Sequence, residues 1–420
     1  MNALRRDALA VLRAGLRAIK TRDAVRQACR LHGEILTVGK KRFDLARYRR
    51  IFVIGMGKAS LESAKELEDL LGDRITDGIV LDVKRSKLRR IKSVAGTHPL
   101  PSVANMRATG EIMAILKQVD SRDLVITIVS GGGSALLCWP FELKCDDLSL
   151  VFKALMAKGA TIAETNIVRK HLSEILGGQF ARLAYPATVL GLIFSDVPGN
   201  DIGVIASGPT VLDSSTIADA ERIIVKYDLL RSCKIGGCNL RETPKDPSLF
   251  KRVTNVLVVS NAIAIDAMVR EAKSRGYTTR VLSTELTGEA RDVGRRLAAE
   301  AKPGEMVLAG GETTVTVRGK GKGGRNQELA LGALRCVLND VLVLSCASDG
   351  IDNSPAAGAI ADKETVAHAN RHRLNPEFYL ERNDSFSFFK RTGDQIITGI
   401  TGANVSDLML SARAKPVSHR

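Results

Sequence analysis

A short loop of serines and glycines, Ser130-Gly131-Gly132-Gly133-Ser134, is the clearest candidate for chemistry in this sequence. It follows six apolar or β-branched residues (124–129), a pattern typical of a buried strand, and helical character begins directly after it. Its glycines allow a close approach of the backbone to a ligand, and Ser134 is expected to cap the following helix. Such a loop in front of a helix predicts an anion site, but leaves open whether the anion is a carboxylate or a phosphate.

Two other glycine-rich loops carry cations. The first, GMGKAS at 55–60, nearly matches a dinucleotide-binding fingerprint, with Asp82 near the expected ribose-binding acid. Lys58 in this loop favours phosphate chemistry over hydride transfer, because its ammonium group offers a point charge to a carboxylate or phosphate. The second, GKGKGG at 319–324, leads into Arg325 and is expected to form a flexible cationic loop that closes over phosphates. The sequence contains no Walker P-loop and no protein-kinase catalytic-loop signature.

Four acids follow predicted strands, at the end of a parallel sheet where α/β enzymes place their sites. They are Asp196, Asp201, Glu312 and Asp349. Carboxylates in such positions can bind Mg²⁺ or accept a proton from a hydroxyl group. His98 and His171 are further candidates for ligands or general bases, with structural roles as the alternative.

Alternating strands and helices should position these residues. Strands are expected near 50–54, 78–83, 88–95, 124–129 and 188–194, with helices between them, which predicts a parallel sheet covered on both faces. Residues 1–45 are predicted to be helical, beginning with an amphipathic surface helix, and 148–184 are predicted to be helical as well. A domain boundary is expected within 233–252. A second α/β pattern follows it, with a hairpin predicted over 306–317.

Composition narrows the class of protein. The 420 residues suffice for two domains, and no apolar run is long enough to span a membrane. Seven cysteines without a CxxC pair argue against zinc and favour reduced thiols in a cytoplasmic protein. The formal net charge is +16, but the basic runs at 47–50 and 84–92 lack interleaved aromatic residues. The charge is therefore expected to attract small anionic substrates rather than nucleic acid.

Taken in order, the motifs resemble those of the class II glycerate 2-kinases, which carry a MOFRL-type C-terminal domain. The matching segments are GMGKAS, HPLPSVAN, VSGGGSALL, NIVRKHLS, SDVPGNDIGVIASGPT, GGETTVTV, GKGGRNQELAL and ASDGIDNSPAAGAI, spread over about 10–410. The resemblance implies a Rossmann-like α/β/α domain at 1–240 and a smaller α/β domain of MOFRL type at 241–420, with the active site in a cleft between them. It also implies ATP- and Mg²⁺-dependent phosphorylation of D-glycerate to 2-phosphoglycerate.

The resemblance further implies roles for individual residues. Lys58, Asp196 and Arg325 match the family's catalytic positions, and the glycine loop at 130–134 matches its cradle for substrate and phosphate. The nucleotide is expected at Asn261, Gly311, Glu312, Lys322, Gly324 and Asn326. Asp201 and Asp349 are the expected metal ligands, although Asn200 stands where relatives often have a second acid.

Two other functions stay open at this stage. NAD(P)H-dependent reduction of hydroxypyruvate is suggested by the near-fingerprint and Asp82, and some relatives carry that name. A regulator that binds anions or sugar phosphates is the non-enzymatic alternative. The expected partners are D-glycerate and ATP, without nucleic acid or membrane, and the protein is expected to be a monomer or a homodimer.

Overall fold

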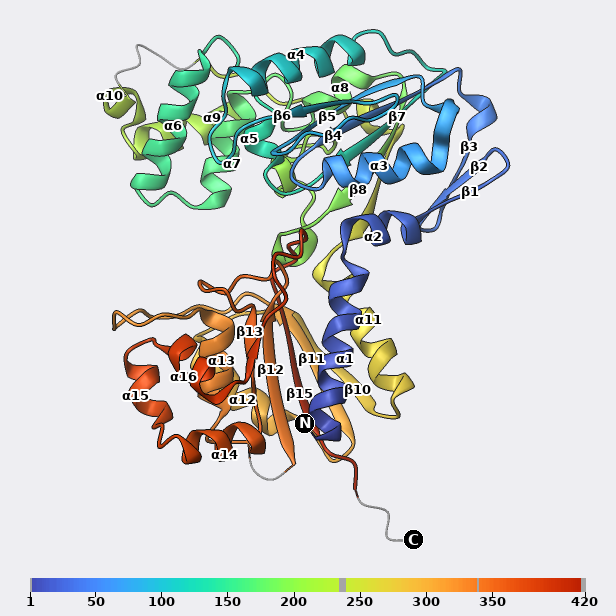
Figure 1. Ribbon diagram of the computed structural model, residues 1–420. Helices are drawn as coiled ribbons and strands as arrows, with labels where there is room; N and C mark the ends of the chain where they lie inside the picture. The colour runs from blue at the N-terminus through green and yellow to red at the C-terminus, as the bar shows by residue number, and fades with distance from the viewer. Residues whose placement is uncertain (1, 234–238, 338–339, 417–420) are drawn as a thin grey trace. The chain divides into compact units, whose positions relative to one another are not determined.

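The structure, a computed structural model, describes residues 2–233, 239–337 and 340–416 (Figure 1). It contains two compact units. The glycine-loop unit comprises 24–195 and 200–258, and the C-terminal unit comprises the N-terminal residues through Asp23, residues 196–199 and the chain from Val259 onward. The N-terminal residues belong to the C-terminal unit because α1 (Ala3–Ala18) packs with α11 (Asn261–Ser274). The 240/241 domain boundary stays a prediction. Part of the expected boundary segment, 234–238 with Cys238, lies outside the described residues.

A six-stranded sheet forms the centre of the glycine-loop unit, in the order β6-β5-β4-β7-β8-β9. Its strands are β4 (Arg50–Met56), β5 (Asp77–Asp82), β6 (Lys92–Ala95), β7 (Asp123–Val129), β8 (Thr188–Phe194) and β9 (Val253–Val259). The pairings from β6 through β8 are parallel, which confirms the predicted parallel sheet. Every residue of β7 is buried, as its continuous apolar sequence predicts.

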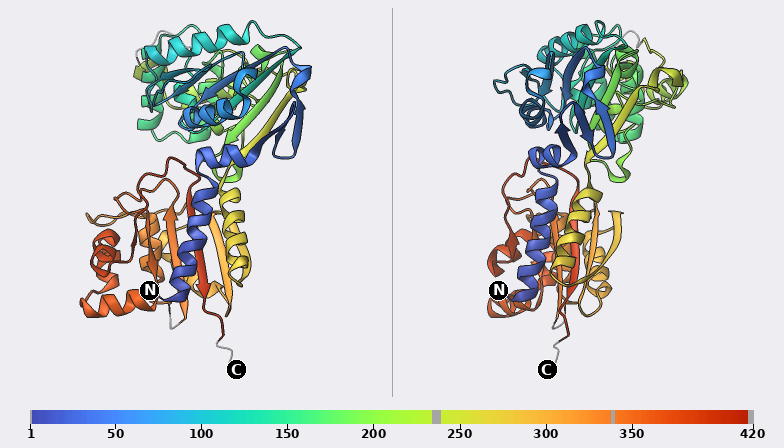
Figure 2. Two further views of the ribbon diagram at one scale, coloured as in Figure 1. Left: turned by 45° about the vertical axis from the view of Figure 1, so that its right-hand side comes forward. Right: turned by 90° about the vertical axis from the view of Figure 1, so that its right-hand side faces the viewer.

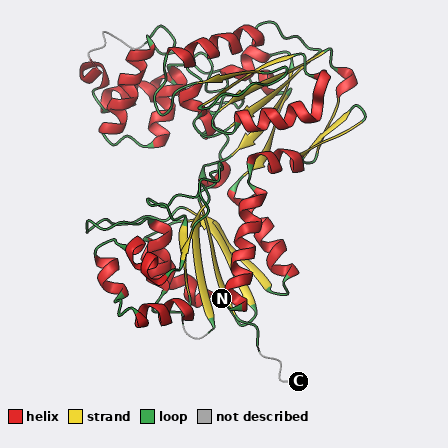
Figure 3. Ribbon diagram, viewed as in Figure 1, coloured by secondary structure: helices red, strands yellow, loops and turns green. Residues whose placement is uncertain are grey.

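Helices lie on both faces of this sheet (Figures 1 and 3). They include α3 (Ser60–Leu71), α4 (Val103–Leu116) and α8 (Gln179–Ala184). The short helix α5 (Gly133–Leu136) follows β7, and α6 (Cys145–Ala157), α7 (Ile162–His171), α9 (Ile217–Lys226) and α10 (Leu229–Cys233) pack around a separate buried apolar cluster. Short 3₁₀ turns lie at Leu45–Arg47, Gly72–Arg74, Ile205–Ser207 and Pro247–Phe250. The side chains of Thr161 and Glu164 form a capping box at the start of α7. That cap fixes where the helix begins and therefore which of its side chains face the interior.

The prediction of helix throughout 1–45 is wrong. Helices α1 (Ala3–Ala18) and α2 (Thr21–Ala28) are followed by a small antiparallel sheet of β1 (Cys29–His32), β2 (Ile35–Val38) and β3 (Lys41–Asp44). The reason is local. Gly33 and Gly39 adopt positive φ angles of 57° and 56°, which permit the two tight turns that connect β1 to β2 and β2 to β3.

The first helix is also more than a surface helix. In Figure 2, α1 runs beside α11 (Asn261–Ser274) along one face of the C-terminal sheet. A Cβ atom at Gly15 would lie 2.8 Å from Cγ of Met268, so the absence of a side chain permits this close approach. The buried guanidinium of Arg5 donates to Asp362 at 2.5 Å and to Asp394 at 2.7 Å. These ion pairs tie the start of the chain to its last third.

The C-terminal unit contains a second six-stranded sheet, in the order β10-β11-β15-β12-β13-β14. Its strands are β10 (Thr278–Leu286), β11 (Glu305–Gly311), β12 (Val341–Ala347), β13 (Gly358–Ala361), β14 (Gln395–Ile396) and β15 (Asp407–Arg413). Only β10 and β11 pair in parallel, and the other pairings are antiparallel. The hairpin predicted over 306–317 is wrong, because β11 pairs with β10 and β15. Thr314 forms only an isolated bridge with Glu289.

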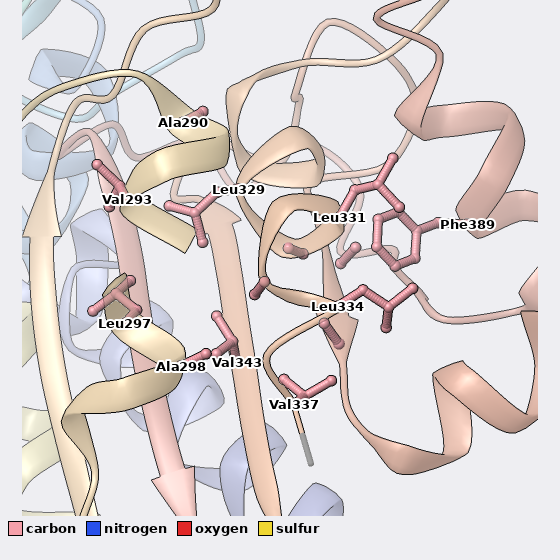
Figure 4. Close-up of a cluster of buried hydrophobic side chains, with 14 of the residues drawn as sticks. Ala290, Val293, Leu297, Ala298, Leu329, Leu331, Leu334, Val337, Val343 and Phe389 are labelled. Atoms are coloured by element: carbon pink, nitrogen blue, oxygen red, sulfur yellow. The ribbon is translucent and has the colours of Figure 1, made fainter. Parts of the chain in front are cut away.

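The remaining helices of this unit pack around a buried apolar cluster (Figure 4). They are α12 (Ala290–Glu300), α13 (Arg325–Ala333), α14 (Lys363–Arg371), α15 (Pro376–Glu381) and α16 (Ser385–Thr392). A Cβ atom at Gly294 would lie 2.0 Å from the carbonyl oxygen of Leu329, so α12 and α13 touch backbone to backbone. This contact fixes α13, whose first residue is Arg325. No helix in the described residues is long and apolar enough to cross a membrane.

Candidate active site

The glycine loop and the Lys58 turn meet at one edge of the parallel sheet. Met56 pairs with Val129, so β4 and β7 end at the same level and their following loops lie side by side. Gly57 has a φ of 111°, and a Cβ atom there would lie 2.2 Å from Oγ of Ser130. The N–H of Lys58 donates to the carbonyl of Gly131 at 3.0 Å. The two loops therefore hold each other in place.

The glycine loop keeps backbone donors available. The N–H groups of Gly131, Gly132 and Ser134 have no hydrogen-bond acceptor among the described residues, and all three residues are only partly buried. The prediction that Ser134 caps a helix is wrong, because α5 has four residues and Ser134 lies inside it. Its Oγ instead shares a hydrogen bond with Oγ of Ser207 at 2.8 Å. The loop therefore offers free N–H groups to an anion, rather than the dipole of a long helix.

The side chains of Lys58 and His98 border this loop. The side chain of Lys58 is exposed and forms no ion pair with a described residue. A Cβ atom at Gly132 would lie 3.1 Å from Cδ2 of His98 and 3.3 Å from Cε of Lys58, so both side chains border the loop. Burial lowers the pKa of His98 below its usual value, and the charges of Lys58 and Arg169 lower it further. His98 is therefore uncharged at neutral pH and can accept a hydrogen bond.

The near-fingerprint at 55–60 is not arranged for a dinucleotide. Asp82 is 2% exposed, and its carboxylate accepts the N–H of Leu61 at 3.0 Å and that of Val83 at 2.6 Å. The N–H of Ala59 donates to Oγ of Ser130 at 3.1 Å. The N–H of Ala59 and the carboxylate of Asp82 are therefore already occupied by hydrogen bonds within the protein. In a dinucleotide-binding site such groups would contact the pyrophosphate and the ribose.

His171, the other candidate histidine, has structural partners. It is fully buried, with Nδ1 at 2.9 Å from the carbonyl of Ile167 and Nε2 at 3.2 Å from the carboxylate of Glu242. These contacts account for both ring nitrogens.

A second site in the C-terminal unit is built around Arg325. Its Nε and Nη2 donate to the carboxylate of Asp407 at 2.6 and 3.0 Å, and its Nη1 lies 3.0 Å from the carboxylate of Glu312. The pocket beside it is lined by Asp196, Glu312, Arg325, Ala347, Ser348, Asp349, Asn404, Ser406 and Asp407. The structure thus brings together four residues that the sequence predicts for the site. The ion pairs hold the guanidinium in one orientation.

Two buried acids in this region were missed by the sequence reasoning. Burial raises the pKa of Asp407 to about 6, although the hydrogen bond and charge of Arg325 act to lower it. Asp352 accepts the N–H groups of Asn326 and Gln327 at 3.1 and 2.9 Å, and so caps α13. Asp349 is predicted because it follows an apolar strand, β12. Asp352 follows the same strand a few residues later, so the same pattern could have identified it. Asp407 lies at the start of a strand and offers no such signal.

The predicted nucleotide-binding residues occupy different environments. The buried amide of Asn261 donates to the carbonyls of Val405 and Asp407, and Asn326 bridges Asp407 at 2.9 Å and Ser345 at 2.6 Å. These two side chains support the Arg325 site from behind. Gly311 ends β11, and Gly324 immediately precedes α13.

The basic loop at 319–324 is anchored, contrary to the expectation of a flexible segment. The N–H of Gly319 donates to Oδ1 of Asn383 at 2.9 Å, and the N–H of Lys322 donates to Oδ1 of Asp384 at 3.0 Å. The ammonium group of Lys322 lies 4.9 Å from the centre of the Phe386 ring. The start of α16 and the turn before it therefore determine where this loop presents its charge.

The two predicted metal ligands belong to different units. Asp201 is exposed and accepts the N–H of Gly203 at 2.8 Å, while the partly buried Asp349 accepts the N–H of Ile351 at 3.0 Å. Within the part of the chain that the structure describes, no group of three or more His, Cys, Asp or Glu residues is arranged to hold a metal ion.

Comparisons with known proteins cover nearly the whole chain. A family model described as "Domain of unknown function (DUF4147)" matches residues 7–235, and the MOFRL family matches 305–407. A glycerate 2-kinase from Pyrococcus horikoshii is 35% identical over 94% of each chain. A relative from Agrobacterium vitis, 37% identical over 86% of each chain, carries a name that proposes hydroxypyruvate reductase activity.

The fold leads to the same group of proteins. The crystal structure of a glycerate kinase from Thermotoga maritima superposes with a TM-score of 0.87 at 31% identity, covering 98% of this chain and all of that one. Its agreement with both family matches confirms the resemblance seen in the motifs. The chain belongs to the glycerate 2-kinase family whose members join a DUF4147 domain to a MOFRL domain.

Proposed function

We propose that this chain transfers the γ-phosphate of ATP to the 2-hydroxyl group of D-glycerate, giving 2-phosphoglycerate and ADP. The hydroxyl oxygen forms the new bond to phosphorus, the bond to the β-phosphate oxygen breaks, and the hydroxyl proton is released. The observation that carries this proposal is the 35% identity to a glycerate 2-kinase over 94% of both chains. The two sets of anion-binding groups, at the glycine loop and at Arg325, are what such a reaction requires.

The proposed roles follow from the side chains. The free N–H groups of the loop at 130–134 bind glycerate, and Lys58 supplies a positive charge beside them. Arg325, oriented by Asp407, stabilises charge on the transferring phosphoryl group. Asp196, in the same pocket, orients the attacking hydroxyl and accepts its proton.

The nucleotide is proposed to contact the residues around α13 and the basic loop, among them Glu312 and Lys322. Asn261, Gly311, Gly324 and Asn326 stay predicted members of that site. The buried side chains of Asn261 and Asn326 would act through the groups they position.

Mg²⁺ is part of the proposal as the ion that accompanies ATP. Such ions are held by one or two carboxylates together with substrate phosphates, so a three-residue protein site is not needed. Asp349 fits this role, because its Oδ1 accepts a hydrogen bond and its Oδ2 has no partner among the described residues. Asp201 stays a second candidate. When bound, Mg²⁺ would neutralise charge on the phosphates, and EDTA is expected to abolish ADP formation.

The test is a coupled assay for ADP with D-glycerate and ATP. Lys58→Ala and Arg325→Ala are each expected to lower kcat by about 10²- to 10⁵-fold, because each removes a charge that acts on the reacting groups. Lys117→Ala and Arg335→Ala remove exposed cations elsewhere and should leave kcat unchanged. Near wild-type kcat in both site variants would refute the assignment.

Hydroxypyruvate reduction is tested with the same preparation. Oxidation of NADH by hydroxypyruvate, without ADP from glycerate and ATP, would reverse the proposal. The occupied carboxylate of Asp82 opposes that outcome. A cytoplasmic location and a monomeric or homodimeric state also stay predictions, which cell fractionation and light scattering can test.

A further inference from the structure

Arg169, on α7, is a partly buried cation without a counterion among the described residues. Its guanidinium stacks on the ring of Phe152 at 4.4 Å, and burial lowers its pKa to about 10. It forms no ion pair with any residue in the described parts of the chain. Because it is costly to remove a charge from water without a partner, an anion supplied by a ligand would stabilise this guanidinium.

One edge of the guanidinium forms no hydrogen bond to a described residue. Its Nη1 donates to Oδ1 of Asn166 at 3.0 Å. Its Nε is buried and has no hydrogen-bond partner, and Nη2 makes no hydrogen bond to a described residue. Nε and Nη2 together form one planar edge, which can donate two parallel hydrogen bonds to a carboxylate.

A chain of hydrogen bonds connects this group to the glycine loop. Oδ1 of Asn166 also accepts from Oγ of Ser207 at 3.0 Å, and Ser207 is bonded to Oγ of Ser134 at 2.8 Å. Ser134 and Arg169 line the same small cavity, with Trp139 and Phe152. The guanidinium is therefore held next to the loop rather than at an unrelated place in the unit.

The charges near the loop agree with an anion at this position. Lys58 and Arg169 both act on His98, and none of the three is paired with a carboxylate among the described residues. Two cationic groups, Lys58 and Arg169, that lie near the loop without an acid as partner indicate that the anion comes from solution.

We propose that the Nε and Nη2 edge of Arg169 receives the carboxylate of the acceptor and so selects 2-hydroxy acids over uncharged alcohols. This inference rests on the proposed function and adds a residue to the same site. Asn166 and Ser207 act as positioning residues, because they hold the guanidinium and Ser134 in one network.

The experiment compares Arg169→Met, which keeps an unbranched apolar side chain but removes the guanidinium, with the wild type. Calorimetric titration with D-glycerate measures binding, and the assay for ADP measures turnover of D-glycerate and of its uncharged amide, D-glyceramide. The variant is expected to lose about 10- to 100-fold in affinity and in kcat/KM for D-glycerate. Its kcat/KM for D-glyceramide and its KM for ATP should change by less than about threefold, since neither depends on the carboxylate contact.

Two further variants make the result decisive. Arg169→Lys keeps the charge but cannot donate two parallel hydrogen bonds, so it should bind D-glycerate with intermediate affinity. This variant provides the test if Arg169→Met does not fold. Arg182→Met serves as the matched control, because Arg182 is also partly buried with a lowered pKa and donates to Gln179 at 2.6 Å. Equal losses for D-glycerate and D-glyceramide, or no loss at all, would overturn the inference.

Failure of the proposed function is distinguishable from failure of this inference. If the proposed function is wrong, the wild type will form no ADP from D-glycerate and ATP. Calorimetry on the wild type and the Arg169 variants will still report whether a carboxylate binds through Arg169.

Discussion

Replacing Asp407 by Asn is expected to stabilise the protein at neutral pH, against the simple expectation for a broken ion pair. Asp407 is fully buried, and Arg325 and Asn326 donate to it at 2.6 and 2.9 Å. Burial nevertheless raises its pKa from the usual 3.8 to about 6, because desolvation outweighs these contacts. The folded protein therefore binds this proton more tightly than the unfolded chain does.

The magnitude follows from linkage. A group whose pKa is raised by folding contributes stability below its unfolded pKa, and that contribution is lost as the pH rises through the folded value. For Asp407 the window runs from 3.8 to about 6. A tenfold change in proton affinity corresponds to about 1.4 kcal/mol, so the cost of the ionised form reaches on the order of 3 kcal/mol at pH 7. Asn resembles the protonated acid and avoids this cost.

Urea unfolding followed by circular dichroism, at several pH values between 4 and 7, measures the difference in unfolding free energy. Asp407→Asn should match the wild type near pH 4 and exceed it by on the order of 2–3 kcal/mol at pH 7. The matched control is Asp123→Asn. Burial acts to raise the pKa of Asp123, but hydrogen bonds from Arg50 and from the backbone N–H of Asp120 outweigh it and lower the pKa. That variant should lose stability most at neutral pH. A loss at pH 7 in Asp407→Asn would show that the ion pair outweighs burial and would refute the reasoning.

Two further predictions concern the glycine-loop unit. Gly57→Ala should cost about 2–5 kcal/mol of unfolding free energy, because the new Cβ atom would lie 2.2 Å from Oγ of Ser130 on a backbone with a φ of 111°. Unfolding followed by Trp139 fluorescence measures this cost, and a stability equal to that of the wild type would contradict the close packing. Lys58→Met should raise the pKa of His98, because the charge of Lys58 acts to lower it. An NMR titration of the His98 ring protons reports the change, and an unmoved pKa would show that the two side chains do not interact.

Local patterns predicted the parallel sheet and the loops at its edge, because a few consecutive residues determine where each strand ends and its loop begins. The apolar run at 124–129 and the glycines after it sufficed to predict a strand that ends in the glycine loop at 130–134. Residues 29–44 show the limit of such reasoning, since a helical period was extended past two glycines into a small antiparallel sheet. The hairpin expected at 306–317 failed for a related reason. The apolar segment does form β11, but its partners β10 and β15 lie elsewhere in the sequence.

The sequence by itself determined which residue types and loops are available for phosphoryl transfer, because glycine turns, capping acids and strand ends are short-range features. Tertiary structure decided which of them are free to act. It brought Asp407 to Arg325 across 82 positions, through the pairing of β15 with β11 and β12, and no local pattern specifies that register. It also placed the carboxylate of Asp82 where it accepts hydrogen bonds from backbone N–H groups. It left Arg169 without a counterion among the described residues. Whether a charged group serves the fold or a ligand depends on its neighbours in space, and folding alone sets these.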